Sequence, residues 1–235
     1  MADYEERFVV FLDILGFSRL VKESAPPSPR ISVEQLREAL TVPDPAGADM
    51  VVIGRIGDVS LCRHRMSHFS DCIVASTDPT EAGLMYLILH IQKIAFRLLR
   101  LRFLCRGGLV KGLLHHDGVA VFGPYHIEKC VAKHPRVVLD DAIARWSYQL
   151  AEPVGRIMRA RIRRHEDGHH AVHVLQSLTT AMSADNGPGP EYTRMCHDIA
   201  NLLDTEIARL HDNPDDRKKV EWFKNHFHDL VRPIR

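Results

Sequence analysis

The stretch around which this chain is organised runs from Phe8 to Ser18 and reads FVVFLDILGFS. Apolar and aromatic side chains lead without a break into one carboxylate, Asp13, and Gly16 then interrupts the run. So apolar a run is typical of a strand buried on both faces, and an ionised Asp13 at its end needs a partner. A divalent metal ion is the simplest partner for such a carboxylate. The alternative interpretation is that Asp13 only caps the helix that follows.

The residues directly after this strand are suited to binding anionic oxygens. Gly16, Phe17 and Ser18 stand where the next helix is predicted to begin, so their backbone N–H groups have no acceptor within that helix. One strand end can therefore offer both a metal ligand and a phosphate-binding turn.

Composition narrows the class of protein. The 235 residues suit one large domain, and 31 basic against 30 acidic residues, net +1, lack the excess of positive charge typical of nucleic-acid binding. No apolar run approaches the ~20 residues that span a bilayer, and the N-terminal MADYEER is unlike a signal peptide, so we expect a cytoplasmic protein that binds no membrane. Five cysteines without a C-x-x-C pair indicate reduced, mostly core thiols.

Hydrophobic periodicity predicts alternating strands and helices. Ser32 is expected to cap a short helix that reaches Leu40, and strands are expected over 50–56 and 59–68. In FSDCIVA, residues 69–75, a second carboxylate, Asp71, begins an apolar β run. A long amphipathic helix follows over 81–100. The remaining predicted elements are a strand over 103–114, a hairpin turn at 115–118, a strand over 119–124, a short helix over 125–132, a strand over 135–139, a helix over 141–150, a strand pair around 167–168, and helices over 191–210 and 214–230.

This order predicts an α+β sandwich, with helices on one sheet face and a C-terminal helical pair. Residues 1–152 are expected to form the core, and residues 153–235 a β-hairpin and helical extension of the same domain. If the first strand lies beside the strand that Asp71 begins, Asp13 and Asp71 meet, although they are 58 residues apart in sequence. Two such carboxylates can hold a two-metal site for in-line displacement at phosphorus. The alternative is two unrelated surface aspartates.

Several motifs resemble those of a known enzyme family, the class III nucleotidyl cyclases. Residues 11–17, FLDILGF, resemble the F-x-D-I-x-G-F signature of these cyclases, and Asp71 stands where their hairpin carries the second metal aspartate. The chain is most similar to the Pycsar-type pyrimidine cyclases of bacterial anti-phage defence. The motifs that carry this similarity are DILGF, FSDCIV, RGGLVKG at 106–112, FGP at 122–124, PRVV at 135–138 and KVEWF at 219–223.

The resemblance covers most of the chain and implies a ferredoxin-like βαββαβ core and a head-to-tail homodimer with active sites between subunits. Each site would convert a nucleoside triphosphate to a 3′,5′-cyclic monophosphate and pyrophosphate, as a second-messenger synthase. It further implies that Asp13 and Asp71, helped by the carbonyl of Ile14, hold two Mg²⁺ or Mn²⁺ ions per active site. The amides of Gly16, Phe17 and Ser18 would then take phosphate oxygens.

Two positions bear on the choice of base. Purine cyclases of this family carry a base-selecting Lys or Glu where this chain has Ser67, and an Asp where it has Ala120. The loss of both charged selectors favours a pyrimidine triphosphate, UTP first and CTP second, over a purine cyclase.

One departure from the family concerns catalysis. The family's transition-state Asn and Arg correspond to Ile127 and Val131, in a segment about one helical turn shorter than in the family. If nothing replaces them, the rate falls by ~10²–10³. A catalytically silent, dimeric nucleotide-binding relative is therefore the main alternative function. The cations that are candidates to replace the missing pair, each of which also fits a structural or surface role, are Arg106, Lys111 and Lys129.

One further motif, H-E-x-x-H, is matched by His165 to His169. A zinc protease needs this motif on one continuous helix, whereas Asp167-Gly168 is typical of a turn. We therefore expect no catalytic zinc there.

Overall fold

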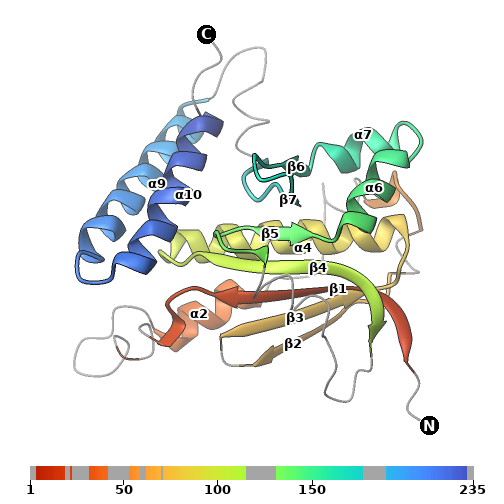
Figure 1. Ribbon diagram of the computed structural model, residues 1–235, viewed down its shortest axis with the longest axis horizontal. Coiled ribbons are helices and arrows are strands. Elements are labelled where there is room, and N and C mark those ends of the chain that lie inside the picture. Colours follow the sequence, from red (N-terminus) through yellow and green to blue (C-terminus); the bar gives the residue numbers. More distant parts are fainter. Residues whose placement is uncertain are drawn as a thin grey trace.

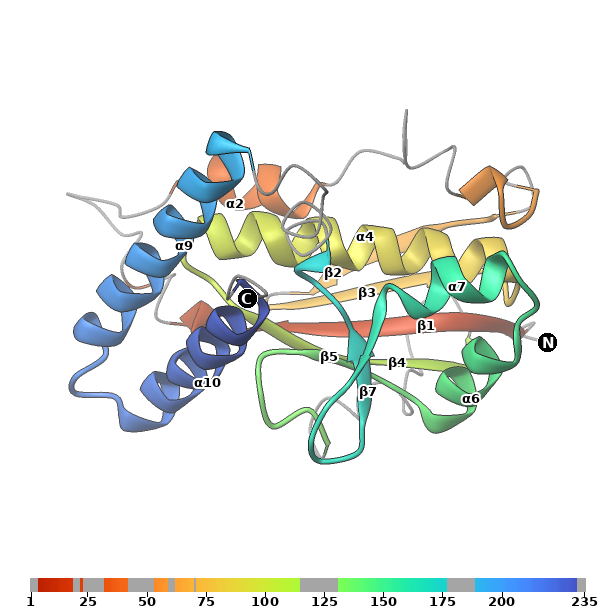
Figure 2. The same ribbon diagram turned by 90° about the horizontal axis from the view of Figure 1, so that it is seen from above.

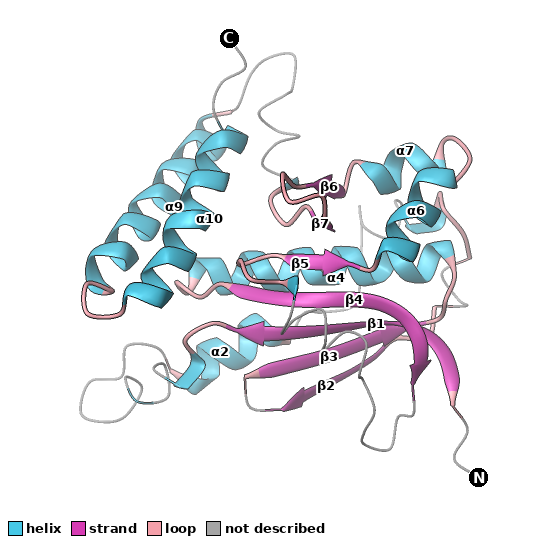
Figure 3. Cartoon of the chain, viewed as in Figure 1, coloured by secondary structure: helices cyan, strands magenta, loops and turns pink. Residues whose placement is uncertain are grey.

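The computed structural model describes residues 4–18, 22, 32–41, 53–58, 62–69, 71–114, 131–176 and 189–231. Within these ranges the protein is a mixed α+β structure, with one seven-stranded, mostly antiparallel sheet and helices packed around it (Figures 1 and 3). The predicted α+β class is confirmed.

Strand β1 (Glu5–Ile14) lies in the middle of the sheet. The strand order is β2-β3-β1-β4-β5-β7-β6, and of the pairs described only β4 with β5 is parallel. The other strands are β2 (Arg65–Phe69), β3 (Cys72–Thr77), β4 (Cys105–Leu114), β5 (Val137–Leu139), β6 (Ile162–Arg164) and β7 (His170–Val172).

The two faces of β1 have different surroundings. Phe8, Val10, Leu12 and Ile14 are buried in the main core together with the apolar side of helix α4 (Glu81–Arg100). Helix α2 (Val33–Leu40) lies beside α4 on this face (Figure 2). Because successive side chains on a strand point to opposite faces, Asp13 points to the face away from α4.

Helix α4 is the element that fills the core. By length and hydropathy it is the one candidate membrane span within the described ranges, yet 72% of its most apolar window is buried inside the protein. Burial of this kind is common for the central helix of a soluble protein.

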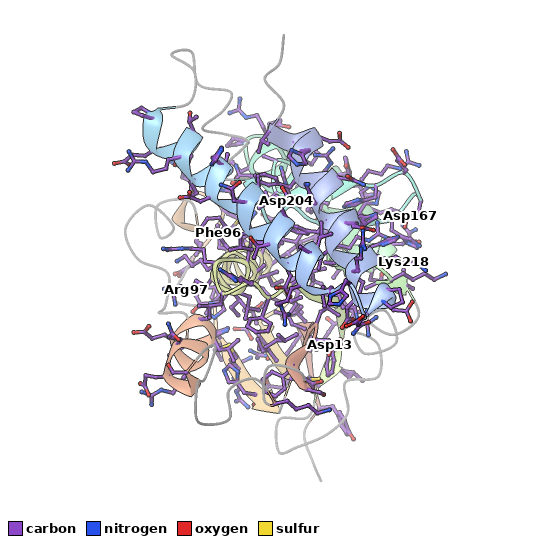
Figure 4. All side chains as sticks on the ribbon, turned by 90° about the vertical axis from the view of Figure 1, so that its left-hand side faces the viewer. Asp13, Phe96, Arg97, Asp167, Asp204 and Lys218 are labelled. Carbon is purple, nitrogen blue, oxygen red and sulfur yellow. The ribbon has the colours of Figure 1, made fainter. Side chains whose placement is uncertain are left out.

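The C-terminal helical pair consists of α9 (Pro190–Arg209) and α10 (Pro214–Val231). It packs against the C-terminal end of α4. A second apolar cluster joins Leu203 and Phe227 of the pair to Leu99 at the end of α4, with Leu15 against it. The carboxyl end of β1, which carries Asp13, therefore lies at the same end of the molecule as α9 and α10 (Figures 1 and 4).

Long periodic segments were predicted well. The helices expected over 81–100, 141–150, 191–210 and 214–230 are α4, α6 (Asp141–Gln149), α9 and α10. Ser32 caps α2 as expected, because its hydroxyl accepts from the Gln35 amide while the Gln35 side chain accepts from the Ser32 amide.

Two predictions were wrong. In the predicted strand over 50–56, residues 53–57 form a turn in which the amides of Ile56 and Gly57 donate to the carbonyl of Ile53. Ile53 and Ile56 are both buried, at a spacing of one helical turn, so the apolar pattern indicated burial but not a strand. The second concerns residues 159–164, where basic residues alternate with small apolar ones, a pattern that predicts an exposed strand face. Helix α7 (Val154–Arg159) instead ends in this run, only 162–164 is strand, and Ile162 is buried. The hairpin at 115–118, the strand over 119–124 and most of the helix over 125–132 lie outside the described residues.

Candidate metal centre

The structure brings Asp13 and Asp71 together. In the antiparallel pair of β1 and β3, Asp13 is opposite Cys72, and Asp71 directly precedes β3. The amide of Ile14 donates to the carbonyl of Asp71 over 2.9 Å, which ties the end of β1 to the β2–β3 turn. One ligand atom each of Asp13, Asp71 and Cys72 lies within 4.8 Å of the other two. We call these three residues the Asp–Asp–Cys cluster; it is the only potential metal-binding group of its kind in the part of the chain that is described.

Arg106 forms an ion pair with Asp13 at this end of the sheet. It is opposite Asp13 in the β1–β4 pair, so both side chains lie on the same face. Arg106 Nε donates to Asp13 Oδ2 over 3.1 Å, and the two side chains are only 19% and 14% exposed. A positive charge therefore already lies against the cluster in a partly buried setting.

Ser67, which the resemblance places near the base, lies on the same face of the sheet as Asp13. Ser67 is opposite Val74 on β3, Val74 is opposite Phe11 on β1, and Phe11 is one row from Asp13. Ser67 is exposed on that face.

The turn after β1 has the conformation that its sequence suggests. Gly16 has a φ of +80°, which favours glycine, and Phe17 and Ser18 begin a helical turn. Phe17 packs on the main core, Ser18 is exposed, and the Ile14 side chain is buried.

Lys111 does not join the cluster. It lies on β4 opposite Phe8, five residues from the Asp13–Arg106 pair, which is roughly 16 Å along a strand. Its Nζ instead pairs with Glu6 Oε2 at 3.0 Å near the surface. Lys129 and Ala120 lie outside the described residues.

Cys105 borders the site, but its side chain lies with that of Ile14 on the α4 face of the sheet, away from the cluster. It is opposite Ile14 on β4 and is buried. Burial, together with the neighbouring charge of Asp13, raises the pKa of its thiol to about 12, so it remains protonated at neutral pH.

Sequence reasoning missed Cys72, which was grouped with the core thiols. The structure has it partly buried beside both carboxylates, with its Sγ 3.5 Å from Asp71 Oδ1. The available signal was its position directly after Asp71 and one residue before the buried Ile73.

A second polar pocket, with a cavity of about 340 Å³, lies between the β6–β7 turn and α10. The Trp222 ring stacks on His134 at a centroid distance of 4.5 Å, and the buried Arg136 binds both carboxylate oxygens of Asp167. Asp167 is labelled in Figure 4. His165 lies in the β6–β7 turn, where its amide donates to the carbonyl of His169, so the H-E-x-x-H letters are not on a helix, as predicted.

Electrostatics in this second pocket favour neutral imidazoles. Burial, aided by the charges of Arg136 and Arg163, lowers the pKa of His165 to about 4. Burial, aided by His165 and Arg163, also lowers the pKa of His226 to about 4. Hydrogen bonds from Arg136 lower the pKa of Asp167 to about 2.

The chemistry of the Asp–Asp–Cys cluster fits a divalent cation. Two carboxylates are the hard oxygen donors that Mg²⁺ and Mn²⁺ prefer, and the backbone carbonyl of Ile14 belongs to the same strand end. No protein-family model matches this chain, and a search of curated proteins finds no match.

Proposed function

We propose that this protein is a nucleotide cyclase that converts a pyrimidine nucleoside triphosphate, UTP before CTP, to the 3′,5′-cyclic monophosphate and pyrophosphate. The observation that carries the proposal is the convergence of Asp13 and Asp71, 58 residues apart in sequence, within 4.8 Å. Under this proposal the product is a second messenger of bacterial anti-phage defence.

The topology supports the proposal. The elements β1-α2-β2-β3-α4-β4 occur in this order along the chain, and their strands are arranged β2-β3-β1-β4, all antiparallel. The same order and strand directions characterise a ferredoxin-like βαββαβ unit, which supports the core that the motif resemblance implies. Asp13 and Asp71 both lie at one end of its two central strands, β1 and β3.

In the proposed reaction the ribose 3′-oxygen attacks the α-phosphorus, the bond from that phosphorus to the β-phosphate bridge breaks, and the hydroxyl proton passes to solvent. Asp13 and Asp71, with the carbonyl of Ile14, would hold Mg²⁺ or Mn²⁺, and such ions acidify the 3′-hydroxyl and neutralise the departing phosphates. The amides of Gly16, Phe17 and Ser18 would orient phosphate oxygens.

Of the two described candidates, Arg106 is better placed than Lys111 to stabilise the transition state. Of the replacements proposed from sequence, Lys111 is paired with Glu6 farther along β4, whereas Arg106 lies against Asp13. A guanidinium can pass from a carboxylate to a phosphate because both present paired oxygen acceptors. We therefore assign it the contact with the transferring phosphate.

The preference for a pyrimidine rests on the absence of a charged selector at both Ser67 and Ala120, of which the described residues include only Ser67. Ser67 lies on the face of Asp13 but carries no charge with which to select a purine. A homodimer with sites between subunits is part of the proposal because the motif resemblance implies it; Asp13 lies on the sheet face opposite α4.

A nucleotide-binding relative without turnover is the second candidate. The specific observation in its favour is the Arg106–Asp13 pair, which occupies one of the two carboxylates. The two candidates differ in whether product forms.

The test is to incubate the full-length protein with Mn²⁺ and each of the four common ribonucleoside triphosphates, and to identify cyclic products by mass spectrometry. We expect product from UTP or CTP, and at least ~10²-fold less from Asp13→Asn or Asp71→Asn, because each removes a metal-binding charge. Asp198→Asn, on the exposed side of α9, is the matched control and should retain full activity. Product that survives both cluster substitutions would overturn the proposal.

A further inference from the structure

We propose that Cys72 is a third metal-binding residue of the cluster, so that the site binds thiophilic divalent cations such as Co²⁺, Zn²⁺ and Cd²⁺ through Asp13, Asp71 and the Cys72 sulfur. The inference rests on the metal centre of the proposed function but not on turnover.

The register of the sheet orients Cys72 toward the carboxylates. Cys72 is opposite Asp13 in the β1–β3 pair, and residues opposite each other project to the same face. The next residue, Ile73, is 1% exposed in the core with α4, so Cys72 must point to the other face. The position of its sulfur therefore follows from the packing of β3 and needs no rearrangement of the strand.

The distances suit one shared cation. Donor atoms bound to a single ion lie no farther apart than about twice a bond length, roughly 4–4.6 Å for oxygen and sulfur ligands. The ligand atoms of Asp13, Asp71 and Cys72 lie within 4.8 Å of one another, and Cys72 Sγ is 3.5 Å from Asp71 Oδ1. Small side-chain rotations are enough to close the set around an ion.

A second observation points to a cation at this place. The Arg106 guanidinium donates to Asp13 Oδ2 over 3.1 Å where both side chains are mostly buried. Positive charge is thus stabilised at the cluster, and an incoming ion would compete with this guanidinium for Asp13 Oδ2.

The donor set determines which ions bind well. Mg²⁺ prefers oxygen ligands and gains little from sulfur, so it would use the two carboxylates alone. Thiolate ligands favour softer ions, and Zn²⁺ and Co²⁺ accept mixed oxygen and sulfur donors. Zn²⁺ should therefore compete with Mg²⁺ at this site, and the competition should depend on Cys72.

The other described cysteines lack this environment. Cys105 is buried on the α4 face of the sheet, Cys196 lies on α9 against the second apolar cluster, and Cys62 packs against the main core with its Sγ 3.8 Å from the Asp58 carbonyl oxygen. None of the three belongs to the cluster. Cys196→Ser is the matched control, because it removes a partly buried thiol elsewhere.

The experiment is a Co²⁺ titration of the reduced, full-length protein followed by absorption spectroscopy. Visible d–d bands report Co²⁺ held by any donors, and a near-ultraviolet sulfur-to-cobalt charge-transfer band reports a bond to a cysteine. We expect the charge-transfer band in the wild type and in Cys196→Ser, and its loss in Cys72→Ser. Calorimetry should show at least about tenfold weaker Cd²⁺ binding by Cys72→Ser, with Mg²⁺ binding unchanged. Circular dichroism confirms that each variant is folded.

The outcomes separate this inference from the proposed function. Visible bands without the charge-transfer band, or a charge-transfer band that survives Cys72→Ser, would overturn the role of Cys72 while leaving the two-carboxylate site in place. Absence of Co²⁺ binding would overturn both. A cysteine-bound Co²⁺ in a protein that makes no cyclic nucleotide would support the inference and reject the cyclase.

Discussion

Arg106 and Asp13 face each other across the β1–β4 pair, with Arg106 Nε 3.1 Å from Asp13 Oδ2. The strand end proposed to bind metal is therefore partly neutralised by the protein itself. Metal and guanidinium compete for the same carboxylate, and this competition leads to the first prediction.

Replacement of Arg106 should have opposite effects on metal binding and on turnover. In Arg106→Gln the competing cation is gone, so Mn²⁺ should bind about 5–10-fold more tightly, which corresponds to roughly 1 kcal/mol. Turnover of the preferred triphosphate should fall by ~10²–10³, because the group assigned to the transferring phosphate is lost. Calorimetry and product analysis measure the two effects separately.

Lys111→Gln is the control, since it removes a cation from the same strand whose partner is Glu6. Its Mn²⁺ affinity and turnover should match the wild type. Equal effects of the two substitutions would show that net charge, and not the contact with Asp13, is responsible.

Gly107 allows the close approach of β4 to β1. A Cβ atom at this position would lie 2.3 Å from the Phe11 carbonyl oxygen and 2.8 Å from a Leu12 methyl carbon. Gly107→Ala should therefore destabilise the protein by about 2–3 kcal/mol and lower its melting temperature by roughly 5–10 °C. Thermal unfolding followed by circular dichroism measures this shift.

Gly112 provides a comparison within the same strand. A Cβ atom there has nothing within 4 Å, so Gly112→Ala should change stability by no more than about 0.5 kcal/mol. If Gly107→Ala also changed stability by no more than about 0.5 kcal/mol, the close approach of β4 to β1 would be contradicted.

The Arg136–Asp167 pair should make stability depend on acid pH. Hydrogen bonds from Arg136 lower the pKa of Asp167 to about 2, so the folded state favours the ionised carboxylate. This stabilisation is present above the unfolded-state pKa of about 3.9 and is lost as the pH falls through about 2. Asp167→Asn should lower the free energy of unfolding by about 1 kcal/mol at pH 7, a modest figure because Asp167 is 44% exposed. It should also reduce the loss of stability at acid pH.

Urea unfolding at several pH values measures that difference. Glu166→Gln, one residue away and exposed, is the control and should keep the wild-type profile. If Asp167→Asn lost as much stability at acid pH as the wild type, a group other than Asp167 would be responsible.

The neutral histidines of the second pocket should also make stability depend on pH, in a range above that in which Asp167 titrates. The pKa of His165 and that of His226 are about 4, below the unfolded value near 6.5, so the unfolded chain takes up protons first. Stability should fall as the pH drops from about 6.5 to about 4. The groups facing these rings include Arg136 and Arg163, which oppose protonation further.

Trp222 offers a local probe of this change, since its ring contacts both histidines. His165→Gln should reduce the slope of stability against pH between 6.5 and 4, while His211→Gln, at an exposed position on the α9–α10 turn, should not. If both variants keep the full slope, the titrating group is not His165.

Elements with a strong local signal could be predicted from the sequence. The apolar period of α4, the capping residues of α2 and the Gly16 turn involve neighbours within a few positions, and all three are found as expected. The segment at 53–57 failed because buried Ile53 and Ile56 fit more than one backbone conformation. Only contact with the rest of the core selects between them.

For the candidate site, sequence alone determined which residues are capable of the chemistry: Asp13 at a strand end, Asp71 at the start of another strand, and several cations as possible partners. The tertiary structure decided which of them meet. Strand register places Arg106 and Cys72 opposite Asp13, and it leaves Lys111 five residues from Arg106 along β4. The physical reason is that register depends on how whole strands bury their apolar faces against α4, a sum over contacts distant in sequence, whereas turns, caps and helical periods depend on neighbours along the chain.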